Sequence, residues 1–217
     1  MINVFIIIGG CLLLVGLLYH EKKKKEKSLL INKTILSSLF VVIALLQPHP
    51  VQTYFYYLLI GLVLCLIGDV CLALPGEKTF KMGLVAFLLG HVFYIFGFAV
   101  LTALPQWISP GALVILGISL FIFIWLRPYL KSMLLPVMVY MLVITAMVFG
   151  AWAVFWKSAV PFTGRALILA GALSFYFSDI FVARDRFIKE EYTNRFMGLP
   201  LYYLGQFSLA FSVGLLK

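Results

Sequence analysis

Apolar stretches long enough to cross a membrane recur along almost the whole chain, and this pattern restricts the fold more than any other feature. A helix needs roughly 20 residues to cross a hydrocarbon core of about 30 Å. Eight such stretches are present: residues 2–19, 30–47, 54–74, 82–103, 110–127, 132–151, 162–183 and 198–216. They lack the alternating ten-residue pattern of outer-membrane barrels. The sequence therefore predicts an all-α membrane protein with eight transmembrane helices, in which residues 1–217 form a single integral membrane domain.

The charged residues predict the orientation of these helices. The net charge of +9 does not point to a nucleic-acid partner, because in a membrane protein the positions of Lys and Arg are more informative than their sum. Fourteen of the seventeen basic residues fall in or beside alternate loops, and the opposite side carries only Lys157, Arg165 and Lys217. Both termini are therefore expected outside the cytoplasm. With no organelle signal recognised, we expect a bacterial inner membrane.

An internal repeat relates the two halves of the chain, which would divide at 1–104 and 105–217. "MGLVAFLLGH" (82–91) aligns without gaps on "MGLPLYYLGQ" (197–206), so that Phe87 faces Tyr202 and His91 faces Gln206. Upstream, "GLVLCLIGDVCLA" (61–73) aligns on "GALSFYFSDIFVA" (171–183). The two segments lie four spans apart, an even number. The sequence therefore predicts two parallel four-helix repeats related by an axis along the membrane normal.

The repeat places an acid twice, at Asp69 and Asp179, and these are the two acidic residues inside predicted spans. Ionised groups inside a membrane are costly and usually face a partner or a cavity. Both acids fall about four residues before the cytoplasmic end of their spans, so they share a depth. We expect a polar pocket open to that leaflet, lined by side chains from neighbouring spans: Lys33, His91, Tyr202, Tyr203 and Gln206. A simple interhelical ion pair with Lys33 is the structural alternative.

Two carboxyl groups in a pocket of low dielectric resist ionising together, so one can serve as an acid and the other as a base. Glycosidases use this division around an oxocarbenium-like state. At this depth, a lipid with a labile bond just below its head group is the natural substrate, and an enol ether fits. The three cysteines lie in apolar spans without metal-ligand spacing, so we expect no metal and no cofactor.

Several motifs together resemble the YhhN family of integral membrane lysoplasmalogenases. They are "GDVCLALP", "FKMGLVAFLLGHVFY", "GALSFYFSDIFVARDRF" and "LYYLGQ", with a lysine at "NKT" early in the second span. The resemblance implies hydrolysis of the alkenyl ether bond of lysoplasmalogens to a fatty aldehyde and glycerophosphoethanolamine or glycerophosphocholine, without a metal. One departure is visible, because the family often has Lys-Pro where this chain has Lys33 and Thr34.

The leading hypothesis is therefore an intramembrane hydrolase acting on a lysophospholipid. Asp69 and Asp179 would divide the acid and base roles in an order that the sequence leaves open. His91 and Gln206 would orient water or the ether oxygen, and Lys33 with Arg184 would hold the phosphate. The alternative is a small proton-coupled transporter or lipid flippase, since parallel repeats and intramembrane acids also suit carriers. A third interpretation is a structural or assembly protein whose acids form packing pairs.

Overall fold

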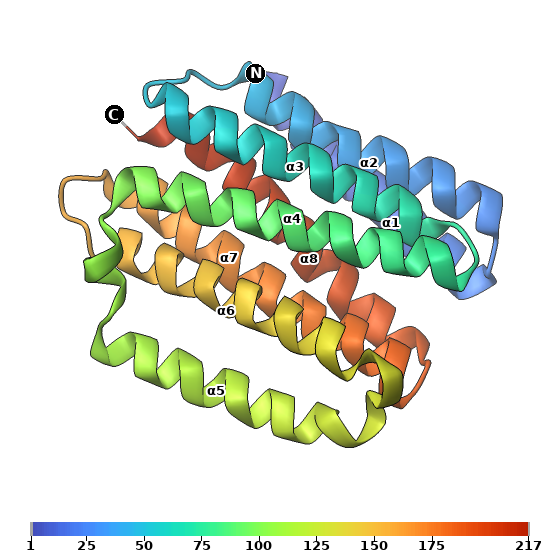
Figure 1. Ribbon diagram of the computed structural model, residues 1–217. Helices are drawn as coiled ribbons and strands as arrows, with labels where there is room; N and C mark the ends of the chain where they lie inside the picture. The colour runs from blue at the N-terminus through green and yellow to red at the C-terminus, as the bar shows by residue number, and fades with distance from the viewer. Residues whose placement is uncertain (1, 217) are drawn as a thin grey trace.

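The computed structural model describes residues 2–216 and contains eight long helices joined by short connections (Figure 1). No β-strand occurs within this range. The long helices are α1 (Ile2–Lys23), α2 (Glu26–Leu46), α3 (Gln52–Ala73), α4 (Glu77–Leu101), α5 (Pro110–Leu126), α6 (Leu134–Phe155), α7 (Phe162–Ala183) and α8 (Tyr192–Ser212). Short helical turns are η1 (Leu104–Trp107), η2 (Arg127–Tyr129), η3 (Lys131–Met133), η4 (Arg184–Ile188) and η5 (Val213–Leu215).

Seven of these helices, α1 to α7, are long and apolar enough to cross a membrane. This finding supports a multi-pass integral membrane protein. Helix α8 has 21 residues, which is about 31 Å of helix and sufficient for a crossing. It is less apolar because it carries polar side chains that are buried inside the bundle, among them Asn194, Gln206 and Ser208. An eighth crossing by α8 stays a prediction.

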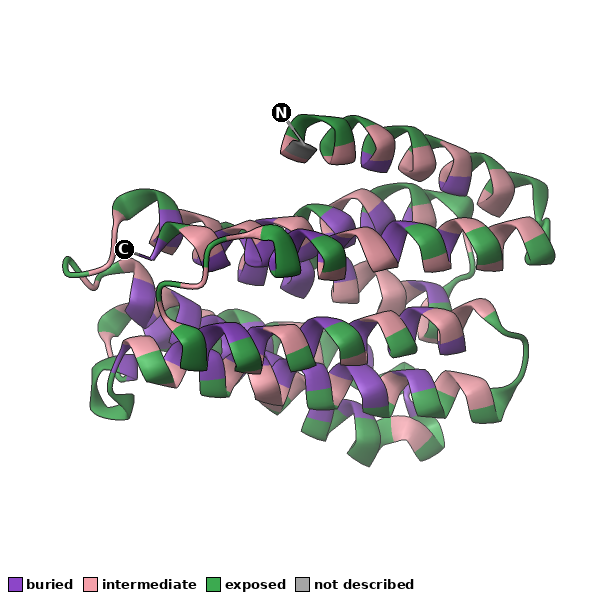
Figure 2. Cartoon of the chain, turned by 90° about the horizontal axis from the view of Figure 1, so that it is seen from above, coloured by how far each residue is buried: buried purple, intermediate pink, exposed green. Residues whose placement is uncertain are grey.

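The bundle has a central group of helices and two peripheral ones. Helices α3 and α4 pack along each other, as do α7 and α8, while α2 packs on α3 and α8, and α6 packs on α7 and α4. Helix α1 lies on the outside against α2 and α8, and α5 lies on the outside against α6 (Figure 1). Buried residues concentrate in the central helices (Figure 2). Exposed apolar side chains such as Phe5 and Phe121 cover the outer helices, as expected where lipid replaces water as the solvent.

Corresponding glycines bring the two helices of each central pair, α3 with α4 and α7 with α8, into close contact. A Cβ atom added at Gly61 of α3 would lie 3.0 Å from the carbonyl oxygen of Gly90 of α4. In α7 and α8, a Cβ atom at Gly171 would lie 3.0 Å from the carbonyl oxygen of Gly205. Small residues allow such close backbone approach between membrane helices. The same register therefore occurs in both pairs that the repeat aligns, whereas the full division at 1–104 and 105–217 stays a prediction.

The chain ends of α1 and α8 lie at the same end of the bundle, and the connections after α1, α3, α5 and α7 lie at the other (Figure 1). These four connections and the helix ends beside them carry the basic residues that the sequence assigned to one side. Lys217, counted with the opposite side, lies outside the described residues. We refer to the end with these connections as the basic end. Its assignment to the cytoplasm stays a prediction.

Candidate functional site

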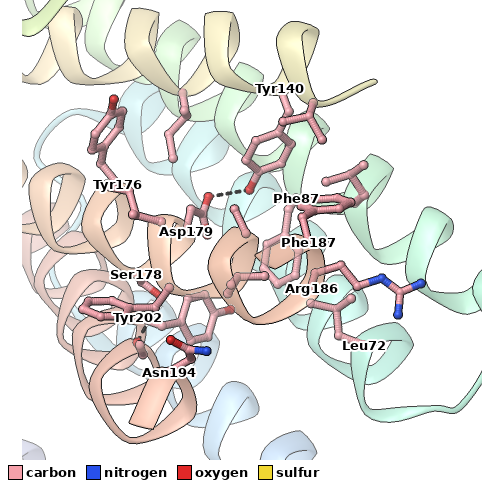
Figure 3. A pocket seen from close by; sticks show the side chains of 18 of the residues that line it. Leu72, Phe87, Tyr140, Tyr176, Ser178, Asp179, Arg186, Phe187, Asn194 and Tyr202 are labelled. Carbon is pink, nitrogen blue, oxygen red and sulfur yellow. Dashed lines mark hydrogen bonds between the residues drawn. The ribbon is translucent and has the colours of Figure 1, made fainter. Parts of the chain in front are cut away.

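A narrow cavity of about 110 Å³ lies in the half of the bundle toward the basic end, and both intramembrane aspartates line it. Its wall is formed by α2 to α8 together with η4. Most of the remaining lining is apolar, with Leu84 and Phe87 on α4 and Val137 and Met141 on α6. Figure 3 shows Asp179 and Tyr140 meeting across this space. The sequence predicted that the two acids lie at the same depth in the membrane, and in the structure both line one cavity.

Asp69 is held by three donors from two other helices. Its Oδ1 lies 3.1 Å from the Nζ of Lys33 on α2, and its Oδ2 accepts hydrogen bonds from the hydroxyls of Ser37 at 2.6 Å and Tyr202 at 2.5 Å. Asp69 and Lys33 are only 1% and 4% exposed, so the ion pair is almost entirely desolvated. A buried pair needs additional hydrogen bonds to offset its desolvation, and Ser37 and Tyr202 supply them.

A chain of hydrogen bonds continues behind Asp69 into the core. The hydroxyl of Tyr202 accepts from the side-chain amide of Gln206 at 3.3 Å, and the carbonyl oxygen of Gln206 accepts from the hydroxyl of Tyr94 at 2.7 Å. The hydroxyl of Tyr203 lies 3.1 Å from that of Ser37. Tyr202 lines the cavity, whereas Gln206 and Tyr203 lie behind its wall. Gln206 and Tyr203 therefore help to hold Tyr202 and Ser37, which donate hydrogen bonds to Asp69.

Asp179 has far fewer partners. Its Oδ2 accepts a hydrogen bond of 2.6 Å from the hydroxyl of Tyr140 on α6, and within residues 2–216 no donor contacts its Oδ1. The residue is partly exposed, unlike Asp69. No ion pair involving Asp179 occurs in the described part of the chain. One carboxyl oxygen is therefore free to meet a ligand in the cavity.

His91 lies outside the cavity wall in an aromatic environment. It is 0% exposed, and neither ring nitrogen has a hydrogen-bond partner among the described residues. Its ring packs edge-to-face against Phe175 at 4.5 Å and Tyr140 at 5.3 Å between centroids. Tyr140 in turn donates a hydrogen bond to Asp179. A role for His91 in orienting water or the ether oxygen stays a prediction, and this packing does not favour it.

Three arginines lie in or near η4: Arg184 and Arg186 belong to it, and Arg195 comes from α8. Arg184 donates to Asn194 at 2.6 Å and pairs with Glu191 at 3.1 Å, and it does not line the cavity. Arg195 pairs with Asp185 at 2.9 Å. The close contact of Lys189 with Glu191 and the charge of Arg184 hold the pKa of the Glu191 carboxyl below its ordinary value. The third arginine, Arg186, lines the cavity.

The family model of YhhN matches residues 28–213, which include every residue of the site described above. The chain belongs to the YhhN family. This membership agrees with the motifs around Asp69 and Asp179 from which the resemblance was drawn.

The relatives of this YhhN protein include two enzymes named lysoplasmalogenase TMEM86B. The mouse protein is 32% identical over 157 residues, covering 72% of this chain and 63% of its own. The rat protein is 30% identical, covering 72% and 61%. A lysoplasmalogenase homolog of Dictyostelium discoideum is 27% identical, covering 78% and 66%. The chain thus spans about three fifths to two thirds of the length of these relatives. No solved structure matches.

The sequence analysis missed several residues of the site in this YhhN protein. Ser37 stands one helical turn after Lys33, a spacing that was a usable signal. Tyr140 comes from the helix before Asp179, as Lys33 comes from the helix before Asp69, so extending the repeat backwards would have pointed to this helix, though not to the residue. Arg186 gave no signal, because the π-helical turn that directs it could not be read from the sequence. Within residues 2–216, no cluster of three or more His, Cys, Asp or Glu side chains could hold a metal ion.

Proposed function

We propose that this YhhN protein is a lysoplasmalogenase-like hydrolase that cleaves the alkenyl ether bond of a lysophospholipid. The main support is the pair of carboxyl side chains, Asp69 and Asp179, on the wall of one cavity inside a membrane protein. The names of the mouse, rat and Dictyostelium relatives supply the substrate class. The apolar lining suits the alkenyl chain, and the position toward the basic end suits a bond just below a head group.

The reaction needs one proton donor and one water molecule. A carboxylic acid transfers its proton to the β-carbon of the enol ether, and the electron pair of the double bond forms the new C–H bond. The resulting oxocarbenium ion takes the oxygen of water at its α-carbon while a base removes a proton. The hemiacetal then breaks its C–O bond to the glycerol while its hydroxyl loses a proton and the leaving glycerol oxygen gains one, which releases a fatty aldehyde and the glycerophospho head group. The proton that the base took from water returns to the acid. Atoms balance with water as the sole co-reactant.

The hydrogen bonds favour Asp179 as the proton donor. Its Oδ1 has no partner in the described chain, so an acid proton on this oxygen would face the cavity. Tyr140 fixes the other oxygen and thereby orients the carboxyl plane. General acid catalysis of this kind requires the donor to lie within hydrogen-bond reach of its target.

Asp69 is better suited to remain an anion. Lys33, Ser37 and Tyr202 donate to its two oxygens, and a carboxylate accepts about four hydrogen bonds in all. One acceptor site is therefore left for a water molecule. In this proposal, Asp69 stabilises the oxocarbenium charge and accepts the proton of the attacking water, with Lys33 as its counter-ion rather than as a phosphate ligand.

The decisive experiment is product analysis by mass spectrometry with purified protein. The substrate is 1-alkenyl lysophosphatidylethanolamine, and the 1-acyl and 1-alkyl analogues are controls. Aldehyde from the alkenyl lipid alone is the expected result. Asp179→Asn should abolish it while the protein still folds, whereas Glu190→Gln, which removes an exposed acid outside the cavity, should leave it intact. Intact substrate with a well-folded sample would refute the proposal, and vesicle assays would then test the transporter alternative.

A further inference from the structure

Arg186 occupies an unusual place at the edge of the cavity. It belongs to η4, a five-residue π-helical turn that follows α7 directly. Its guanidinium lies 4.2 Å from the ring centroid of Phe80 on α4, and its side chain lines the cavity. Figure 3 shows it extending away from the ribbon of η4 beside Phe187. A cation over an aromatic face is held without being neutralised, so its charge stays available.

The first two residues of η4, Arg184 and Asp185, fix the turn against α8. Asp185 is buried and pairs with Arg195 at 2.9 Å, and it accepts from the side-chain amide of Asn194 at 3.2 Å. Arg184 also bonds Asn194 and pairs with Glu191. Turns of π-helix are rare and occur often at functional sites. Here the side chains of Arg184 and Asp185 hold the turn in place through their contacts with Glu191, Asn194 and Arg195. The turn directs Arg186 toward α4.

Arg186 is the one cation of the cavity wall that forms no ion pair in the described chain. The charge of Arg186 acts on the carboxyl of nearby Glu77, but that acid is paired with Lys81 at 2.7 Å. The wall has two other basic side chains, and each already has an acidic partner. Lys33 is paired with Asp69 and is 4% exposed, and Arg195 is paired with Asp185. Arg184 does not reach the cavity. A negatively charged group that enters from the basic end can therefore bind the guanidinium of Arg186, which forms no ion pair in the described chain.

We propose that Arg186 binds the phosphate of the lysophospholipid and thereby sets the depth of the ether bond. The proposal rests on the proposed function and adds a head-group site to it. Seven residues separate Asp179 from Arg186, which is about 10 Å along a helix. In the substrate, the three-carbon glycerol backbone separates the ether oxygen from the phosphate. With the phosphate on the exposed arginine, the ether bond reaches inward toward the carboxyl of Asp179.

An arginine matches this task because its planar guanidinium donates two parallel hydrogen bonds to phosphate oxygens. The stacking on Phe80 holds the plane in a fixed orientation. A substrate without phosphate forgoes these contacts but keeps the contacts of its alkenyl chain. Arg186 should therefore distinguish a phospholipid head group from a neutral one.

Kinetics with two substrates test the site. For 1-alkenyl lysophosphatidylethanolamine, Arg186→Gln should raise KM by roughly ten- to a hundredfold, the range for a lost charge-assisted hydrogen bond, with little change in kcat. For 1-alkenylglycerol, which lacks phosphate, the same variant should leave KM unchanged. Arg186→Lys should recover part of the loss. Lys78→Gln removes an exposed charge at the same end outside the cavity and should match the wild type with both substrates. An equal rise in KM for both substrates, or none for either, would overturn the proposal.

A binding measurement separates this site from the chemistry. The probe is the 1-alkyl ether analogue of lysophosphatidylethanolamine, which cannot be hydrolysed as an enol ether, and inorganic phosphate is the competitor. Weaker binding of this analogue to Arg186→Gln supports the phosphate site even where no alkenyl lipid is cleaved, in which case the proposed function alone fails. Equal binding to wild type and variant overturns the site even where hydrolysis is normal. Competition by inorganic phosphate in the wild type but not in the variant supports Arg186 as the anion ligand, and competition that is equal in both overturns it.

Discussion

Removing the positive charge of Lys33 should destabilise the protein more than any other single charge removal at the basic end. The Nζ of Lys33 and the Oδ1 of Asp69 lie 3.1 Å apart, and the two side chains are 5% and 2% exposed. Breaking a buried pair leaves an uncompensated charge and costs about 3–5 kcal/mol. Asp69 keeps the hydroxyl donors of Ser37 and Tyr202, so Lys33→Met should fall near the lower value, about 3 kcal/mol.

The assay is thermal unfolding in detergent, and the measured quantity is the midpoint temperature, Tm, of each variant. For a chain of this size, about 3 kcal/mol corresponds to a fall in Tm of roughly 6–12 °C. The control is Lys81→Met, which breaks the pair of Lys81 with Glu77 at 2.7 Å, a shorter contact than that of Lys33 but more than half exposed on both sides. Solvent-exposed pairs contribute little, so this variant should show no resolvable change in Tm.

A double-mutant cycle tests the cause of the loss. Asp69→Asn removes the stranded charge while its carbonyl oxygen can still accept from Ser37 and Tyr202. The double variant of Lys33→Met and Asp69→Asn should therefore be more stable than Lys33→Met alone, with a coupling energy of at least about 2 kcal/mol. A Tm for Lys33→Met within 2 °C of the wild type, or strictly additive effects in the cycle, would refute the buried ion pair as the source of stability.

Further predictions concern packing and the two tyrosines of the site. Gly205→Ala should lower stability by about 1–3 kcal/mol in thermal unfolding, because the new Cβ would lie 2.9 Å from the backbone oxygen of Gly171. Gly117→Ala should not lower stability, because no atom lies within 4 Å of the position of its new Cβ. Tyr202→Phe removes a donor to its aspartate and should lower kcat about ten- to a hundredfold in the aldehyde assay, with the fold retained. Tyr140→Phe frees the proposed proton donor to rotate and should lower kcat with little change in KM; an unchanged kcat would exclude it as a positioning residue.

The sequence predicted the features that depend on hydrophobicity and spacing. The length of the apolar stretches predicted the helices, and the predicted bounds agree with the observed ones within a few residues at most ends. The exceptions are ends that polar or charged turns extend. Helix α8, for example, begins at Tyr192 rather than at 198. The paired acids followed from the cost of charge in a membrane, and the structure places both on one cavity. These inferences succeeded because they use local patterns that a bilayer enforces strongly.

The partners of the acids were harder to predict, because they depend on how helices rotate about their axes. Gln206 and Tyr203 were expected in the pocket, yet their polar groups lie behind its wall and bond to Tyr202 and Ser37. Arg184 was expected to hold phosphate, but Glu191 and Asn194 already bind it. Rotating a helix by one residue, about 100°, decides whether a side chain faces a cavity or a neighbour. Hydropathy is too coarse to fix that angle.

The departures from the repeat at the positions that contact the two acids act in one direction, and under the proposed function they explain how two similar halves hold an anion and a proton donor. Asp69 receives a donor from Tyr202, whereas the aligned residue on the other side is Phe87, which has no hydroxyl. Gln206 supports that donor, whereas its aligned partner His91 has no hydrogen bond in the described chain and packs among aromatic rings.

The helices that precede the acids differ in the same direction. Lys33 brings a positive charge to Asp69, and Tyr140 brings a neutral hydroxyl to Asp179. If the scaffold alone determined the state of each carboxyl, the two halves would bind protons alike. Because the exchanged positions that contact the acids add donors at Asp69 and omit them at Asp179, they support the proposed roles of Asp69 as the anion and Asp179 as the proton donor. On this argument, replacing Tyr202 by Phe makes the two sites more alike, and the loss of activity should come from the weakened difference between them rather than from a lost contact with the lipid.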